Sequence, residues 1–198
     1  MVEKLLELDK SLFLFLNGLG SETFDGLWLL ITKQVAWTPI FLIILYLVFK
    51  HLGWRHALLV IGIITLILLV TDQSVNLVKG YFQRLRPVNN PEFADVMRIV
   101  QRRNSYSFFS GHAANSMAVA VVLFLIMKPY LKYMGFIFLW PLVFAYSRIY
   151  LGLHYPFDIL CGYVYGALMG LLFFQLYKFA RDKFFPAQKE NLDHPTNR

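Results

Sequence analysis

Residues 147–158 of the chain read Ser147-Arg148-Ile149-Tyr150-Leu151-Gly152-Leu153-His154-Tyr155-Pro156-Phe157-Asp158, and they separate two long apolar segments. An apolar protein keeps an arginine, a histidine and an aspartate close to a bilayer when these groups pair with one another or carry out chemistry. Proline favours the first turn of a helix and pushes the residue before it towards extended backbone. We therefore expect a helix that has His154 just outside it and Asp158 in its first turn.

A carboxylate in that position can hold one imidazole nitrogen of His154 and leave the other nitrogen free as a nucleophile or a base. Taken alone, the same residues fit a helix-start aspartate beside an interfacial histidine equally well. The rest of the chain has to decide between these two interpretations.

The composition indicates an integral membrane protein of one domain. Of the 198 residues, 58% are hydrophobic and only 16% are charged, whereas a soluble domain carries about 25% charged residues. The first apolar run, residues 12–16, is short and follows acidic residues, so we expect no cleavable signal peptide. The single cysteine, Cys161, excludes an internal disulfide and lies in an apolar run, where we expect it to pack.

The hydropathy pattern predicts an all-α fold, an integral membrane helical bundle of five or six transmembrane helices. Five spans are expected at residues 35–52, 54–79, 111–127, 131–146 and 157–174, with Gly53 turning the chain between the first two. Residues 3–17 predict an amphipathic helix whose apolar part is too short to span, so it should lie in the interface. If residues 12–31 did cross, there would be six spans and the N-terminus would be inside.

The expected domain organisation is simple. Residues 1–185 should form a single membrane domain that includes a long polar loop at residues 80–109, and residues 186–198 should be a polar disordered tail. No internal repeat is visible in the sequence.

Counting the crossings places the polar residues of interest on one face of the membrane: Lys79, Arg86, Ser110, His112, Arg148, His154 and Asp158. Polar residues without a common role would be spread over both faces. The opposite face has short basic connections at residues 50–55 and 128–132 and a basic tail after Tyr177, and short basic loops stay in the cytoplasm. We therefore expect the site to face the periplasm or the exterior of a bacterial inner membrane. The arginines of the 80–109 loop count against this orientation unless they have a chemical role.

Three clusters on that face fit the binding and transfer of a phosphoryl group. Lysine and arginine side chains neutralise a phosphate strongly where water is excluded. Ser110 is expected to cap the third span, which leaves free backbone N–H groups at Gly111 and His112 as an anion site. His112 can give a proton to a leaving oxygen, and His154 can attack phosphorus in line. The net charge of +7 is explained by this anionic substrate and by cytoplasmic loops, so we expect no nucleic-acid partner.

The spacing of these clusters resembles the three signature motifs of the type-2 phosphatidic acid phosphatase superfamily. The matching pattern is Lys79-(six residues)-Arg86-Pro87, then Ser110-Gly111-His112, then Ser147-Arg148-(five residues)-His154-(three residues)-Asp158. That family includes membrane lipid phosphatases, glucose-6-phosphatase, bacterial acid phosphatases and vanadium-dependent haloperoxidases. The resemblance covers roughly residues 79–158. One position departs from the family pattern, because Phe109 stands where a proline usually precedes the serine.

The resemblance implies a role for each motif residue. His154 would be the nucleophile that forms a phosphohistidine, Asp158 would orient it, and His112 would protonate the leaving alkoxide or phosphate. The family's phosphate-binding groups correspond to Lys79, Arg86, Ser110, Gly111 and Arg148. No metal ion and no other cofactor are implied, and water then hydrolyses the phosphohistidine. Without the constellation, Lys79 and Arg86 would fit interfacial anchors.

Several polar residues outside the motifs are candidates for supporting roles. Asp72 and Asn76 share a helical face with Lys79, which should look into the protein, so they either support Lys79 or pack the helix. Arg102 and Arg103 are candidates for contact with a headgroup, although a solvated or headgroup-facing loop is the preferred reading for them and for Arg98. We expect no role in the site for three other histidines, His51, His56 and His194.

The sequence therefore predicts a metal-independent membrane phosphatase that removes the terminal phosphate of a lipid phosphate or diphosphate. Undecaprenyl diphosphate is the first choice of substrate, followed by phosphatidylglycerol phosphate, phosphatidic acid and lipid A phosphate. Its expected partners are this lipid and the bilayer, with no obligate protein partner. A non-catalytic lipid-phosphate binder or transport component is a second class, and a phosphotransferase is a third. Intact His112, His154 and Asp158 count against the binder, and the membrane spans count against a haloperoxidase.

Overall fold

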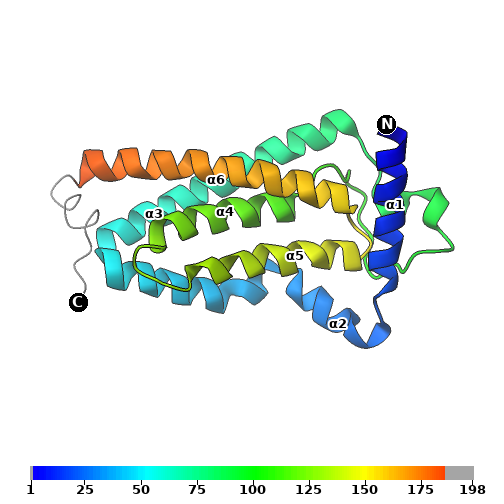
Figure 1. Ribbon diagram of the computed structural model, residues 1–198, viewed down its shortest axis with the longest axis horizontal. Helices are drawn as coiled ribbons and strands as arrows, with labels where there is room; N and C mark the ends of the chain where they lie inside the picture. Colours follow the sequence, from blue (N-terminus) through cyan, green and yellow to red (C-terminus); the bar gives the residue numbers. More distant parts are fainter. Residues whose placement is uncertain (1, 186–198) are drawn as a thin grey trace.

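The computed structural model describes residues 2–185, and within them the chain is helical with no strand (Figure 1). Six α-helices carry the fold: α1 (Val2–Gly18), α2 (Glu22–Ile31), α3 (Thr38–Phe82), α4 (Gly111–Met127), α5 (Leu139–Tyr150) and α6 (Pro156–Phe184). Four short 3₁₀ helices connect them: η1 (Gln34–Trp37), η2 (Pro87–Asn89), η3 (Pro91–Phe93) and η4 (Met134–Phe138). The expected tail at residues 186–198 lies outside the described residues.

Helix α3 is two helices joined at a sharp turn. Gly53 has a φ of 79° and a ψ of 169°, which are not helical values. Glycine adopts a positive φ without the steric cost that a Cβ atom would bring. The chain therefore folds back on itself at this residue, at the left of Figure 1. This confirms the prediction that Gly53 turns the chain between two helical segments.

The lengths of the helices suit a membrane protein. The 29 residues of α6 correspond to about 44 Å of helix, whereas the hydrocarbon core of a bilayer is about 30 Å thick. The segment that contains α3, and α6 itself, are long and apolar enough to cross a membrane, and α4 and the α5 region are shorter apolar helices. The two halves of α3 run beside α4, α5 and α6 along the long axis of the molecule, whereas α1 runs across one end of this bundle (Figure 1).

Helix α4 lies at the centre and packs against α3, α5 and α6. Its approach to α6 is close because α6 presents a glycine on every fourth residue. A Cβ atom on Gly162 would lie 2.7 Å from the backbone oxygen of Ser110, and one on Gly170 would lie 2.8 Å from that of Ala118. Small residues at this spacing let two helix backbones approach each other in a membrane, where van der Waals packing replaces the hydrophobic effect. Glycines of α6 thus fix the start of α4 against the start of α6.

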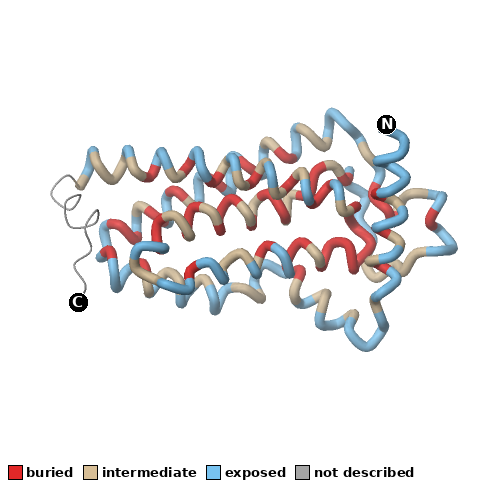
Figure 2. The backbone as a smooth tube through the Cα atoms, viewed as in Figure 1, coloured by how far each residue is buried: buried red, intermediate tan, exposed pale blue. Residues whose placement is uncertain are grey.

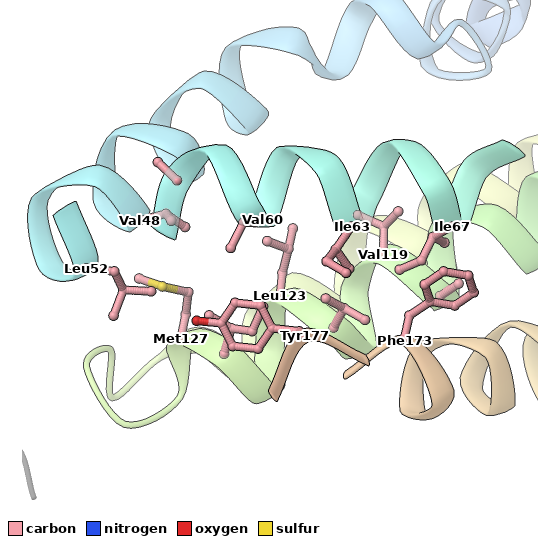
Figure 3. Packing of buried hydrophobic residues seen from close by; sticks show 14 of the residues in the cluster. Val48, Leu52, Val60, Ile63, Ile67, Val119, Leu123, Met127, Phe173 and Tyr177 are labelled. Atoms are coloured by element: carbon pink, nitrogen blue, oxygen red, sulfur yellow. The ribbon is translucent and has the colours of Figure 1, made fainter. Parts of the chain in front are cut away.

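Apolar side chains fill the space between the two halves of α3, α4 and α6 (Figure 3). The labelled members of this core include Val48, Ile67, Leu123 and Phe173, all buried. In Figure 2 the buried residues concentrate along α4 and at the α1 end of the bundle, whereas the outward faces of α3 and α6 are exposed. Those exposed faces are themselves rich in leucine, which is the surface that lipid chains would contact.

The fourth predicted span begins and ends too early. Residues 131–146 were expected to form it, but α5 comprises Leu139–Tyr150 and η4 precedes it. Pro141 explains the late start, because proline has no N–H to donate and is accommodated in the first turn of a helix. The later end places Arg148 in the last turn of α5. By contrast, the third span was predicted at residues 111–127, and α4 has these bounds.

Candidate active site

The third motif has the backbone that was predicted for it. Helix α5 ends at Tyr150, and Gly152 turns the chain with a φ of 78°. The amides of Leu153 and His154 donate to the carbonyl oxygen of Arg148 at 2.9 and 3.3 Å. Tyr155 is extended, with φ −75° and ψ 155°, and α6 begins at Pro156. His154 therefore lies just outside the helix and Asp158 lies in its first turn.

The two ring nitrogens of His154 face different partners. Nδ1 lies 3.4 Å from Oδ2 of Asp158 and 3.4 Å from Oγ of Ser107, and Nε2 lies 3.0 Å from Nη1 of Arg86. A guanidinium has donors and no acceptor, so this contact requires an Nε2 without a hydrogen. The hydrogen of the neutral ring then belongs to Nδ1, where the Asp158 carboxylate can accept it. The lone pair of Nε2 is thereby directed towards the cations of the site.

The surroundings of His154 keep its ring neutral. The side chain is buried, with 2% of its surface exposed. Burial, followed by the positive charges of Arg86 and Arg148, holds the pKa of His154 well below its usual value. A neutral imidazole is the form that can attack phosphorus.

Arg86 is held rigidly by the loop that follows α3. Its Nε donates to the backbone oxygen of Ser105 at 2.7 Å, and its Nη2 donates to the Ser105 hydroxyl at 2.9 Å. Nη1 also donates to the backbone oxygen of Leu153 at 2.7 Å. The guanidinium is 1% exposed, so its position is set before any anion arrives. Such a preorganised cation suits the developing charge of a phosphoryl group.

Arg148 and His112 meet at a residue that the sequence analysis missed. Nη1 of Arg148 donates to the hydroxyl of Thr32 at 2.6 Å, while its Nε is buried and has no hydrogen-bond partner among the described residues. The ring of His112 stacks on Phe144 with centroids 4.7 Å apart and also faces the backbone of Thr32. Thr32 follows α2 directly, so the second helix helps to build the site. The unused Arg148 donor is available to an anion.

Ser110 caps α4, as predicted. Its Oγ accepts a hydrogen bond from the Ala113 amide at 3.4 Å, and its own amide donates to the Asp158 backbone oxygen at 3.0 Å. The first turn of α4, with Gly111 and His112, is thus tied to the first turn of α6. Phe109, in the place of the usual proline, is buried against Val75 and Ala114.

Lys79 and Arg103 complete the cationic surroundings. Lys79 lies in the last turn of α3, half-buried, and its charge acts on Arg86 and Arg148. Arg103 is exposed, yet its charge acts on Arg86, Arg148 and His154. The structure thus gathers all the predicted cations of the motifs around His154. Arg102 is also exposed but lines a separate hollow beside Val88 and Met97.

One prediction about the polar residues outside the motifs is wrong, and Arg98 has an ion-pair partner that was not predicted. Asp72 and Asn76 do not look into the protein: both are exposed and bond to each other at 3.3 Å, because Thr71 and Val75 occupy the inward positions of α3. The charge of Asp72 still acts on Lys79, so the supporting role of Asp72 stays a prediction. Arg98 is partly exposed, with 27% of its side-chain surface accessible. It forms an ion pair with Asp25 at 3.0 Å and lies over the ring of Tyr150.

Four further residues support the site and were not singled out from the sequence. Ser107 donates to Oδ2 of Asp158, and Arg84 lies within bonding distance of Asp158 and Asp9. Asn17 is fully buried and bonds to the backbone of residues 98, 149 and 150. A signal for α1 was present, because Asp9, Phe13 and Asn17 recur every four residues and form its buried face. Within residues 2–185, no cluster of three or more histidine, cysteine or acidic residues could hold a metal ion.

Comparison with known proteins agrees with this geometry. The model of the PAP2 superfamily matches residues 53–182. The chain is 39% identical to a lipid A 4′-phosphatase of Bacteroides thetaiotaomicron, over 88% of this chain and 79% of that protein. It is 32% identical to a lipid A 4′-phosphatase of Porphyromonas gingivalis, over 94% and 80% of the two chains. An undecaprenyl-diphosphatase of Sulfolobus acidocaldarius is 29% identical, over 83% and 76%.

A solved structure shares the fold. The first transmembrane PAP2 type phosphatidylglycerolphosphate phosphatase from Bacillus subtilis superimposes with a TM-score of 0.65 at 23% identity. The match covers 91% of this chain and 88% of that one.

Proposed function

Because the chain belongs to the PAP2 superfamily and is similar to two lipid A 4′-phosphatases, we propose that it hydrolyses a phosphate monoester of lipid A through a phosphohistidine at His154. The observation that carries this proposal is the orientation of the His154 ring. Its Nε2 lies 3.0 Å from Nη1 of Arg86, while its Nδ1 faces Asp158. A nucleophilic nitrogen beside a fixed guanidinium is the arrangement that in-line attack on a phosphate requires.

In the first step, Nε2 of His154 attacks phosphorus and the bond from phosphorus to the lipid oxygen breaks. Protonated His112 gives its proton to that leaving oxygen. A helix N-terminus disfavours a charged imidazole. The two negative charges of the substrate phosphate must offset this effect in the complex. The phosphorylated His154 carries a positive charge with its hydrogen on Nδ1, and the Asp158 carboxylate stabilises it.

In the second step, water attacks the phosphohistidine. His112, now neutral, takes a proton from the water, and the bond from Nε2 to phosphorus breaks to release inorganic phosphate. Lys79, Arg86 and Arg148 hold the phosphate oxygens through both steps, together with the amide of Gly111 and with Ser110. The buried Nε of Arg148 supplies one donor for this purpose.

The substrate proposal departs from the sequence-based first choice. Undecaprenyl diphosphate is less well supported than lipid A phosphate, which was one of the alternatives. The two lipid A 4′-phosphatases are 39% and 32% identical to this chain, against 29% for the undecaprenyl-diphosphatase. The motif residues contact the phosphate, which all of these lipids share, so we propose that residues outside the motifs select the headgroup. Arg103, exposed above the site, is our candidate for contact with the headgroup.

We also propose that the site faces the periplasm from the bacterial inner membrane and that the enzyme needs no protein partner. The short basic connections at the opposite end of the bundle support this orientation. Asn104→Cys in a Cys161→Ala background places a thiol at an exposed position of the polar loop. Treating intact cells with a membrane-impermeant thiol reagent then tests the orientation. Labelling only after the cells are opened would contradict the orientation.

A panel assay tests the activity and the substrate together. Purified protein in detergent is given lipid A, undecaprenyl diphosphate, phosphatidylglycerol phosphate and phosphatidic acid in the presence of EDTA, and inorganic phosphate is measured. We expect the fastest release from lipid A, undiminished by EDTA. Faster release from another lipid would overturn the substrate proposal, and loss of activity in EDTA would overturn the metal-independent mechanism.

A further inference from the structure

The Asp158 carboxylate is completely buried and is held from two sides. Oδ2 accepts hydrogen bonds from the Ser107 hydroxyl and from the Tyr155 amide, the latter at 3.0 Å, and it faces Nδ1 of His154. Oδ1 accepts a hydrogen bond from Nη1 of Arg84 at 2.6 Å. One oxygen therefore faces the histidine, and the other is anchored by Arg84, which lies between Lys79 and Arg86 in the sequence but is not one of the motif residues.

Arg84 in turn joins Asp158 to the N-terminal helix. Its Nη2 donates to Oδ2 of Asp9 at 2.7 Å, and its guanidinium lies over the ring of Tyr155 at 4.0 Å from the centroid. Asp9 is 6% exposed, and its Oδ1 accepts the Phe157 amide at 2.8 Å. Asp9 thus contacts both Arg84 and the first turn of α6. The chain of contacts runs from α1 through Arg84 to Asp158 and ends at His154.

We propose that Asp9 and Arg84 are positioning residues, which hold the Asp158 carboxylate against Nδ1 of His154. The proposal rests on the proposed role of His154 as the nucleophile. Neither residue would touch the substrate. Helix α1 would therefore be part of the catalytic apparatus and not only an interfacial anchor.

The charges explain why two carboxylates share one guanidinium. A fully buried carboxylate without a cation is strongly unfavourable and tends to take up a proton. Burial raises the pKa of the Asp158 carboxyl, and Arg84 opposes this rise, which favours the carboxylate form that accepts the Nδ1 hydrogen. If Arg84 were paired with Asp158 alone, its charge would weaken the attraction between Asp158 and the phosphorylated imidazolium. Asp9 offsets that charge, so the three groups together carry one net negative charge beside His154.

The substitution Asp9→Asn tests this role with little change in shape. The asparagine oxygen can still accept the Phe157 amide, so only the charge and its bond to Arg84 are lost. Glu7→Gln is the matched control, because Glu7 is an exposed acid on the same helix whose carboxylate pairs with Lys10. Steady-state kinetics on lipid A micelles and thermal unfolding in detergent are measured for both variants. We expect Asp9→Asn to lower kcat roughly tenfold to hundredfold with KM unchanged, and Glu7→Gln to behave as wild type.

A double substitution tests whether Asp9 and Arg84 act as one unit. If they do, Asp9→Asn added to Arg84→Lys lowers kcat no further than Arg84→Lys alone. Wild-type kcat in Asp9→Asn, a change confined to KM or thermal stability, or full additivity in the double variant would each overturn the proposal. The failure of the proposed function would look different, because wild-type protein would then release no phosphate from lipid A.

Discussion

Nη1 of Arg86 lies 3.0 Å from Nε2 of His154. Because arginine only donates, this contact identifies Nε2 as the unprotonated nitrogen and Nδ1 as the nitrogen that faces Asp158. The ring is thus fixed between a cation and an anion that belong to different motifs. A phosphate oxygen in position for attack would accept the hydrogen bond from Arg86 that Nε2 of His154 accepts here.

Removing the charge of Asp158 should abolish most of the activity. In Asp158→Asn the side-chain amide can donate to Nδ1, which would move the ring hydrogen to Nε2 and eliminate the nucleophile. We expect kcat to fall by roughly 10³-fold to 10⁴-fold, as when the aspartate of a serine-protease triad becomes asparagine. Single-turnover phosphate release from lipid A measures it. Asp95→Asn is the control, because Asp95 is an exposed acid in the polar loop. A fall in kcat below tenfold in Asp158→Asn would show that Asp158 does not set the tautomer.

The lowered pKa of His154 predicts a pH dependence of stability. Burial and the nearby cations lower the pKa of His154, so the folded ring stays neutral at pH values below its usual pKa. The unfolded ring binds a proton below pH about 6.5. This contribution to stability is therefore complete above pH about 6.5 and declines as the pH falls below that value. Thermal unfolding in detergent between neutral and mildly acidic pH should show a falling midpoint, with a shallower fall in His154→Gln. Equal slopes in the two proteins would contradict this.

Thr32 should matter for phosphate binding although it lies outside the motifs. Its hydroxyl accepts a hydrogen bond from Arg148 at 2.6 Å, and a bond to a charged group contributes about 1.5–3 kcal/mol. Thr32→Val keeps the shape and leaves Arg148 less well fixed, so kcat/KM should fall roughly tenfold to hundredfold. Thr65→Val is the matched control, because Thr65 lies on an exposed face and its hydroxyl donates to the backbone oxygen of Ile61 in the same helix. Equal kcat/KM values in the two variants would exclude this role.

Asn17 should stabilise the contact between α1, the polar loop and the end of α5. Its side chain bonds to the backbone oxygens of Arg98, Ile149 and Tyr150 and accepts the Arg98 amide at 2.8 Å. Asn17→Leu would leave several buried polar groups unpaired, at about 1–3 kcal/mol for each. The thermal midpoint should fall markedly, whereas it should hardly change in Ser11→Ala on the exposed face of the same helix. A midpoint equal to that of wild type would show that the contact is not structural.

Much of the site could be predicted because its chemistry is local in the sequence. Pro156 fixes the start of α6, and this alone places His154 and Asp158 on either side of a helix boundary. Ser110 likewise marks the start of α4, because serine is a preferred N-cap residue. Gly53 marks the hairpin in α3, because an apolar run of that length has to turn somewhere and glycine permits the required backbone.

The parts that escaped prediction depend on contacts between distant segments. Asp9 and Arg84 are 75 residues apart in the sequence, and Thr32 and Arg148 are 116 apart. The spacing of Asp9, Phe13 and Asn17 puts Asp9 on the buried face of α1, but no local feature indicates that its partner is Arg84. The prediction that Asp72 and Asn76 face the protein interior was wrong for the opposite reason. A shared helical face with Lys79 was visible, but the direction of that face is set by how α3 packs, where Thr71 and Val75 point inward.

The central claim is that His154 carries the phosphoryl group. The most direct test is to mix wild-type protein with lipid A labelled at its phosphates, quench within the first turnover with alkali, and locate the label by peptide mass spectrometry. The account predicts an alkali-stable, acid-labile phosphoryl group on His154, absent from His154→Ala. Phosphate release by wild type without a labelled His154, or release that persists in His154→Ala, would contradict the account.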